Sequence, residues 1–290
     1  MLLNKKISVF YFLRQIQSQI LLIILFAIGI GYIDMHPWLK DIVVPLSISA
    51  LLGTAVSLLL AFRTSQSYER WWEARIVWGA IVNDSRTLVR LAMQFLPEEE
   101  ARELAQRQVI WNYALSMSLR KVPFADFITN YLKQHNIDAT NIPNALLDRH
   151  SSQIRKAAEQ GLISDFARMQ LNEIVTRLCD SMGRCERIKN TVFPRSYSLL
   201  LHTLIYVFTA LLPFGLDDEQ LAVEIALTII IPVIFIAIEK TAIIMQDPFE
   251  NSPADTPMTK LSQTIEQNII DAAGIEPVGS EQQPPTYYQM

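Results

Sequence analysis

The sequence predicts an all-α membrane protein. Half of its 290 residues are hydrophobic and its mean hydropathy is +0.21, above the usual value for a soluble globular domain. Apolar stretches without an interior charge occur toward both ends of the chain, and a long polar segment with helical periodicity lies between them. No segment shows the apolar–polar alternation of a half-buried strand. We therefore expect transmembrane helices joined to a large helical domain in water.

Four apolar stretches are candidate membrane spans: residues 20–33, 43–62, 196–216 and 225–238. A helix needs roughly 20 residues to cross a bilayer core of about 30 Å, so the second and third are long enough alone. With its flanks the first span is expected at about residues 18–38, where Trp38 suits the membrane interface. A signal peptide is the alternative for residues 1–33, but no small-residue cleavage pattern follows Gly31 and Tyr32.

These spans divide the chain into five expected parts. They are the N-terminal helices with the first two spans (1–62), a cytoplasmic helical domain (63–195), the third and fourth spans (196–245), a cytoplasmic C-terminal helix (246–274) and a flexible tail (275–290).

The distribution of Lys and Arg predicts the orientation, because these residues accumulate on the cytoplasmic side of short loops. The loop at residues 34–42 contains Lys40 as its sole basic residue. Basic residues instead precede the first span and follow the second: Lys5, Lys6, Arg14, Arg63, Arg70 and Arg75. Both termini are therefore expected in the cytoplasm.

Helix signals recur through the polar segment. Three glutamates after Pro97 suit the first turn of a helix that should run to about Leu119. A short helix is expected from Asp148 to Gln160, and a long one from Leu162 to Lys189 with Ser164 as a candidate cap. A further helix is expected over 260–273.

The second span has two faces that differ in character. Small side chains recur at every fourth position and would let helices approach closely: Ser49, Gly53, Ser57 and Ala61. The neighbouring stripe carries Thr54, Leu58 and Phe62 and grows bulkier along the helix. If several copies packed through the small stripe, the second stripe would form apolar rings that gate a pore by dewetting. Alternatively, both stripes pack against the other spans of the same chain.

Several motifs resemble the bacterial branch of the bestrophin family. The segment LLAFRTSQSYERWWEAR covers 59–75, CERI covers 185–188, LPFGL covers 212–216 and DPF covers 247–249. The resemblance extends over roughly residues 15–260, with its motifs in the same order. It implies an all-helical pentamer with four spans per subunit, a cytoplasmic vestibule and a hydrophobic neck at Thr54, Leu58 and Phe62.

Two departures from the family pattern lead to further expectations. Thr54 replaces a bulky aliphatic residue, so the outer end of the neck should be wider and wetter. Vertebrate bestrophins bind calcium through an acidic run after the DPF-like motif, whereas here Asp247, Glu250 and Asp255 are few and scattered. We therefore expect no metal site and no cofactor.

Other polar residues near the spans have structural interpretations. Below the neck, Trp71 and Trp72 are expected to pack under the membrane while Arg70 and Glu73 pair as i, i+3 neighbours. Glu239 is the candidate functional acid near the end of the fourth span, although a carboxylate there could also snorkel to the interface.

The motifs exclude some functions and favour others. No GxSxG, HExxH, P-loop or GxGxxG pattern is present, so an enzyme is not expected, and neither is a nucleic-acid partner. The expected partners are four further copies of the chain, membrane lipid and monovalent ions, in a bacterial inner membrane. Acidic outer loops and the resemblance favour sodium over chloride. The alternatives are an anion (chloride) channel of the same architecture and a non-conducting membrane scaffold or regulator.

Overall fold

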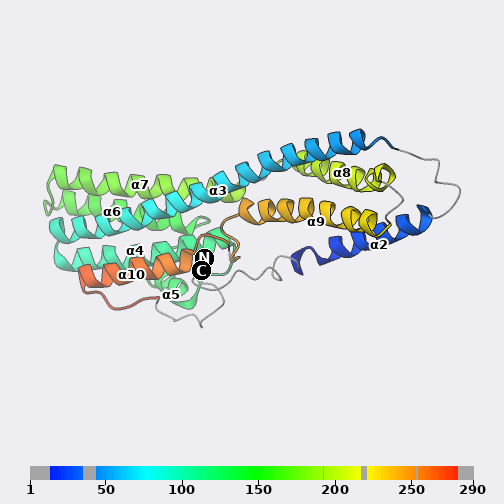
Figure 1. Ribbon diagram of the computed structural model, residues 1–290. Coiled ribbons are helices and arrows are strands. Elements are labelled where there is room, and N and C mark those ends of the chain that lie inside the picture. The colour runs from blue at the N-terminus through cyan, green and yellow to red at the C-terminus, as the bar shows by residue number, and fades with distance from the viewer. Residues whose placement is uncertain (1–13, 35–43, 192, 217–220, 253, 280–290) are drawn as a thin grey trace. The chain divides into compact units, whose positions relative to one another are not determined.

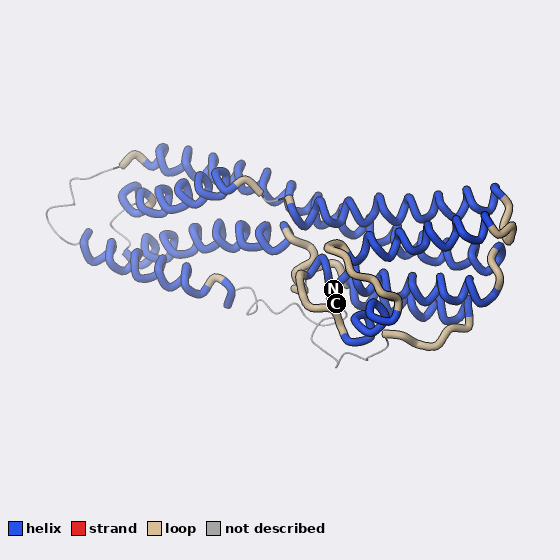
Figure 2. Tube along the Cα trace, turned by 180° about the vertical axis from the view of Figure 1, so that it is seen from behind, coloured by secondary structure: helices blue, strands red, loops and turns tan. Residues whose placement is uncertain are grey.

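The structure is a computed structural model that describes residues 14–34, 44–191, 193–216, 221–252 and 254–279. Throughout this part of the chain every regular element is a helix (Figure 2). The chain divides into two compact units. We call residues 6–70 and 192–246 the apolar unit, and residues 1–5, 71–191 and 247–290 the polar unit.

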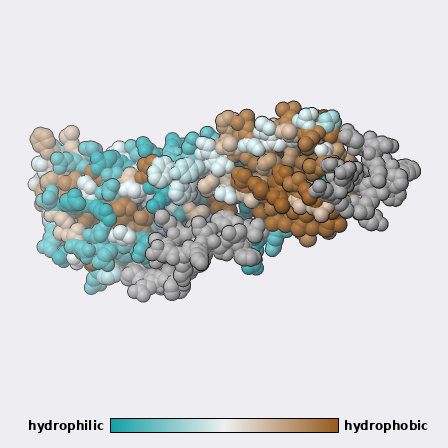
Figure 3. Space-filling view, viewed as in Figure 1, coloured by the Kyte–Doolittle hydropathy of each residue, from teal (hydrophilic) through white to brown (hydrophobic). Residues whose placement is uncertain are grey.

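The apolar unit contains α2 (Gln17–Asp34), the first half of α3 (Leu46–Phe95), α8 (Arg195–Leu211), the short helix η1 (Pro213–Gly215) and α9 (Leu221–Gln246). Helix α2 packs along α9, and α8 contacts both α9 and η1 (Figure 1). Hydrophobic residues gather over the visible face of this unit (Figure 3). The side chains at its centre are Ile16, Ile23, Val56, Leu60, Leu201, Ile205 and Ile236.

Two helices among the described residues are long and apolar enough to cross a membrane, α3 and the segment 222–246 of α9. Helix α8 has 17 residues, and the apolar segment of α2 is shorter still. Residues 35–43, which include Trp38 and the expected end of the first span, lie outside the described residues. The expected number of four spans stays a prediction.

Helix α3 differs from the expected second span in its length. Its 50 residues continue without interruption through Phe62, where the sequence interpretation placed a domain boundary. No proline or glycine pair interrupts the segment after Phe62, so backbone hydrogen bonding continues even though the side chains become polar. The compact units divide at residue 70 instead.

The polar unit comprises the second half of α3, α4 (Glu98–Arg120), α5 (Asp126–Gln134), α6 (Ile142–Glu159), α7 (Asp165–Asn190) and α10 (Met258–Ala273). Its core includes the fully buried indoles of Trp78 and Trp111. Helix α10 packs on α4, and α6 packs on both α4 and α7. A single core therefore joins segments far apart in the sequence.

Capping side chains define several of these helices. The predicted cap Ser164 is confirmed, because its side chain accepts a hydrogen bond from the amide of Ala167. Asn141 likewise caps α6 by accepting from the amide of Asn144. Helix α6 thus begins six residues earlier than the expected Asp148, since Pro143 fits the first helical turn rather than a loop.

The beginning of the expected flexible tail is held in place. After α10, Gly274 adopts a left-handed conformation with φ of 61° and ends the helix. The amides of Val278 and Gly279 then donate hydrogen bonds of 2.6 and 2.7 Å to the buried carboxylate of Glu266. A long-range acceptor thus satisfies these two amides, and the flexibility of the tail stays a prediction. Residues 280–290 lie outside the described part.

Candidate functional site

The stripe assigned to the neck is uncovered along the apolar-unit half of α3. Leu58 and Phe62 are 57% and 59% exposed, and Thr54 is exposed as well. The hydroxyl of Thr54 donates to the carbonyl of Ala50 at 2.8 Å, so it is satisfied within its own helix. Large apolar side chains left uncovered by their own chain require a partner or a membrane. The neck assignment itself stays a prediction.

The small-residue stripe of α3 is divided between two environments. Ser49 is buried and its hydroxyl donates to the carbonyl of Leu211 at 3.4 Å. Gly53 lies against the ring of Phe208, so closely that an added Cβ would stand 3.1 Å from a ring carbon. Ser57 and Ala61 are exposed. The first half of the stripe therefore packs on α8 of the same chain, and the second half is free of such packing.

An apolar hollow of about 510 Å³ lies beside the uncovered half of the small stripe. Helix α3 contributes Ser57 and Ala61, and α9 contributes Phe235 and Ile238. The lining is predominantly apolar, which suits a side chain from another helix or a lipid tail.

A buried cluster of charged side chains follows the neck stripe directly. Nη1 of Arg63 lies 2.9 Å from Oε1 of Glu239, and both side chains are 3% exposed. The second carboxylate oxygen lies 2.9 Å from Nε2 of His202, a half-exposed residue of α8. The guanidinium also stands 5.1 Å from the centre of the Phe193 ring. Glu239 thereby connects three helices of the apolar unit: α3, α8 and α9.

Sequence reasoning singled out Glu239 but found neither of its partners. Arg63 had been counted among the basic residues that follow the second span, and His202 had not been singled out. Snorkelling is excluded as the role of Glu239, since its carboxylate is buried and paired. The sequence offered two signals: a basic residue directly after the second span, Arg63, and an acid near the end of the fourth, Glu239. Neither signal specifies which residues form the pair.

The residues expected below the neck are engaged, but differently from the prediction. The predicted pairing of Arg70 with Glu73 is wrong. Nε of Arg70 donates to the carbonyl of Gln246 at 3.0 Å, and Glu73 forms a 2.8 Å ion pair with Arg187. The observed partners of Arg70 and Glu73 come from other helices, and the spacing of residues within one helix cannot reveal them.

The two tryptophans at this level differ in exposure. The indole N–H of Trp71 donates to the carbonyl of Ala254 at 2.7 Å. Trp72 is 49% exposed, with its ring centre 6.1 Å from that of Trp71. Trp71 thus anchors the segment after α9 within the polar unit, a structural role.

Two of the acids that follow α9, Asp247 and Asp255, accept hydrogen bonds or form an ion pair within the same chain. Asp255 accepts hydrogen bonds from the amide and hydroxyl of Ser252 at 2.8 and 2.5 Å. Asp247 forms a 2.6 Å ion pair with Lys189. Burial raises the pKa of Asp255 and of Glu250. Among the described residues, no group of three His, Cys, Asp or Glu side chains is arranged to hold a metal ion.

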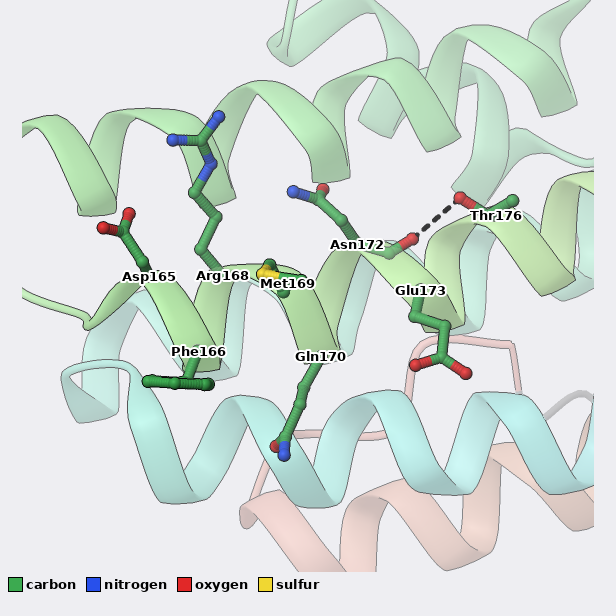
Figure 4. A pocket seen from close by; sticks show the side chains of 8 residues that line it. All are labelled: Asp165, Phe166, Arg168, Met169, Gln170, Asn172, Glu173 and Thr176. Carbon is green, nitrogen blue, oxygen red and sulfur yellow. Dashed lines mark hydrogen bonds between the residues drawn. The ribbon is translucent and has the colours of Figure 1, made fainter.

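A larger hollow follows one side of α7 in the polar unit (Figure 4). All of its lining side chains come from this single helix. Phe166 and Met169 are 81% and 69% exposed there. A surface formed by one helix provides no converging polar groups, so it does not define a ligand site.

The chain is similar to curated and solved proteins over almost its whole length. The family model described as "Bacterial/Fungal Bestrophin protein" matches residues 8–271. The voltage-dependent anion channel-forming protein YneE of Escherichia coli is 30% identical, over 96% of this chain and 93% of that protein. The voltage-dependent anion channel-forming protein RSc3414 of Ralstonia nicotianae is 29% identical, over 90% of this chain and 88% of that protein.

Solved structures agree with these relatives. A crystal structure of a bacterial bestrophin homolog from Klebsiella pneumoniae superimposes with a TM-score of 0.83 at 28% identity, covering 90% of this chain and all of that one. The fold and the relatives together define a membrane protein of the ion-channel class, not an enzyme. The chain belongs to the bacterial and fungal bestrophin family, which confirms the resemblance found in the sequence.

Proposed function

We propose that the chain is one subunit of a homopentameric channel for monovalent ions, with α3 lining the pore. The uncovered stripe of Thr54, Leu58 and Phe62 supports this proposal most directly, because α3 buries its opposite side, with Val56 and Leu60 at most 2% exposed. Rings of Leu and Phe would form a constriction that conducts only when wetted. Thr54 would widen the outer end of that neck.

The contact between copies would use the hollow beside Ser57 and Ala61. Small side chains allow close approach of helices in lipid, where packing rather than hydrophobicity drives association. Ser49 and Gly53 already pack within the chain, so the second half of the stripe remains for a neighbouring copy. The number five follows from the family resemblance, and native mass spectrometry of the purified protein tests it.

The permeant ion is inferred from the relatives, whose names correct the sequence-based expectation. The curated relatives are named as anion channel-forming proteins, which does not support the sodium permeability expected from the acidic outer loops. An apolar neck carries no charge with which to choose the ion. We therefore infer anions as the permeant species of this channel.

The proposed location is a bacterial inner membrane with four spans and both termini in the cytoplasm. The Lys and Arg distribution supports that orientation. Membrane lipid would surround exposed apolar side chains of α8 and α9, among them Leu199 and Ile230.

Reconstitution of the purified protein in planar bilayers tests the function. We expect single-channel currents and, in asymmetric NaCl, a reversal potential close to the chloride equilibrium value. A reversal potential at the sodium equilibrium value would overturn the inference that anions permeate, but would still support a channel function. Absence of current from an assembled oligomer, for wild type and neck variants alike, would instead favour the non-conducting scaffold.

A further inference from the structure

The polar unit contains a polar pocket that shares no residue with the candidate functional site. It has a volume of about 250 Å³ and is formed by α4, α6 and the segment that follows α5. Its charged lining comprises two acids and three bases: Glu100, Glu103, Arg107, Arg149 and Lys156. A mixed set of charges could serve many purposes, so the partners of each group decide what the pocket can bind.

Both acids of the pocket have partners within it, and Glu103 is also paired with a base. Arg107 is 4% exposed and forms an ion pair with Glu103 of its own helix. Nη1 of Arg107 donates to the side-chain oxygen of Gln153 at 3.0 Å. The amide nitrogen of Gln153 donates in turn to the main-chain carbonyl of Glu100 at 2.8 Å and lies 3.4 Å from its carboxylate. The side chains of this wall bind one another, so the wall does not require a bound cation.

The opposite wall on α6 carries positive charge without a matching acid. Arg149, Ser152 and Lys156 recur at i, i+3 and i+7, which places them on one face of the helix. Arg149 donates a long hydrogen bond of 3.4 Å to the carbonyl of Asn136. Over the described ranges, no carboxylate forms an ion pair with Arg149 or Lys156. With three bases against two acids, the pocket has a net positive charge of one, although the whole chain has a net charge of −4.

We propose that this pocket binds a small organic or inorganic dianion of the carboxylate or phosphate class. Arg149 and Lys156 would donate to its charged oxygens, and the hydroxyl of Ser152 between them would supply a neutral donor. The two bases are seven residues apart, or about 10 Å along the helix, so they can approach a dianion from two ends. The volume is below the range of sites for drug-sized ligands, which limits the occupant to a small molecule.

Isothermal titration calorimetry on the full-length protein tests the site. Succinate and inorganic phosphate serve as separate probes, each against NaCl of equal ionic strength. We expect saturable binding of one probe molecule per chain, and at least about tenfold weaker binding for the Arg149→Gln/Lys156→Gln double variant. Binding of one probe alone assigns the class as carboxylate or phosphate.

Arg155→Gln is the matched control. Arg155 is an exposed neighbour on α6 whose Nε lies 3.8 Å from Glu159, and it does not line the pocket. This variant removes one positive charge from the same helix and should leave binding unchanged. Ser152→Asp places a negative charge in the pocket and should abolish binding in a chain whose unfolding temperature is preserved. The proposal is overturned if neither probe binds saturably, or if Arg155→Gln weakens binding as much as the double variant.

Discussion

Arg63 and Glu239 form a buried ion pair of 2.9 Å, and Arg63 directly follows Phe62, the last residue of the neck stripe. Removal of one partner from such a pair leaves the other charge buried without compensation, which costs about 3–5 kcal/mol. The pair therefore fixes the rotation of α3 about its own axis, and with it the direction in which Phe62 points. A merely exposed pair at this position would not have that consequence.

Glu239→Gln should destabilise the protein strongly. The expected loss is about 3–5 kcal/mol of unfolding free energy, because Arg63 would keep its charge in a buried site. Thermal unfolding in detergent measures it. The double variant Arg63→Met/Glu239→Leu should recover much of the loss, since no lone charge is left. Glu69→Gln, an exposed acid of α3, is the control and should change little. Equal stability of Glu239→Gln and wild type would contradict a structural role for the pair.

Substitutions in the neck stripe should change conductance without unfolding the subunit. Leu58→Ala and Phe62→Ala shorten side chains that are more than half exposed in the single chain, so each should raise single-channel conductance. Thr54→Leu should lower it by extending the apolar constriction outward. Leu199→Ala on α8 removes a similarly exposed side chain outside the stripe and should leave conductance unchanged. A neck variant that behaves like Leu199→Ala would place the constriction elsewhere.

His150 should make the polar unit sensitive to acid. The imidazole is completely buried; its Nε2 lies 3.1 Å from the side-chain oxygen of Gln108 and its Nδ1 faces Arg107. Burial, and then the charge of Arg107, hold the pKa of His150 well below its usual value. Below about pH 6.5 the unfolded chain binds a proton that the folded chain does not, so stability falls as the pH falls.

Denaturant unfolding between pH 7.5 and 5 measures this contribution. The wild type should lose up to about 1.4 kcal/mol per pH unit through His150 below pH 6.5. His150→Gln should show a shallower dependence, whatever its stability at neutral pH. The same substitution at His135, the partly exposed residue that caps the end of α5, is the control. If the free energy of unfolding fell equally with pH in wild type and His150→Gln, His150 would not be the source of the acid sensitivity.

Glu266 should hold the segment after α10 in place. Its carboxylate accepts hydrogen bonds from the amides of Val278 and Gly279 and from the hydroxyl of Tyr113, the last at 2.7 Å. Hydrogen bonds to a charged group contribute about 1.5–3 kcal/mol each. Glu266→Gln should therefore raise the hydrogen-exchange rate of both amides by at least about tenfold. Glu276→Gln removes an exposed acid of the same segment and should leave both exchange rates unchanged. Similar exchange rates in the two variants would contradict the role of Glu266.

Local patterns in the sequence predicted much of the fold. Period and hydropathy act over one or two turns, so they identified α4, α6 and α7 of the polar segment, but not α5, and the apolar stretches of α3 and α9. They also identified the cap at Ser164. Family motifs were equally local and were confirmed by the family model over residues 8–271.

The sequence by itself determined the helical class, the apolar spans and the family, because each depends on residues close together in the chain. Tertiary structure decided which side chains meet. Arg63 and Glu239 are 176 positions apart, and Tyr113 and Glu266 are 153 apart. No local period encodes such pairs, and Arg70 and Glu73 show the converse, since suitable spacing did not make them partners. Burial makes the difference: a charge withdrawn from water must find an opposite charge or donor wherever packing brings one.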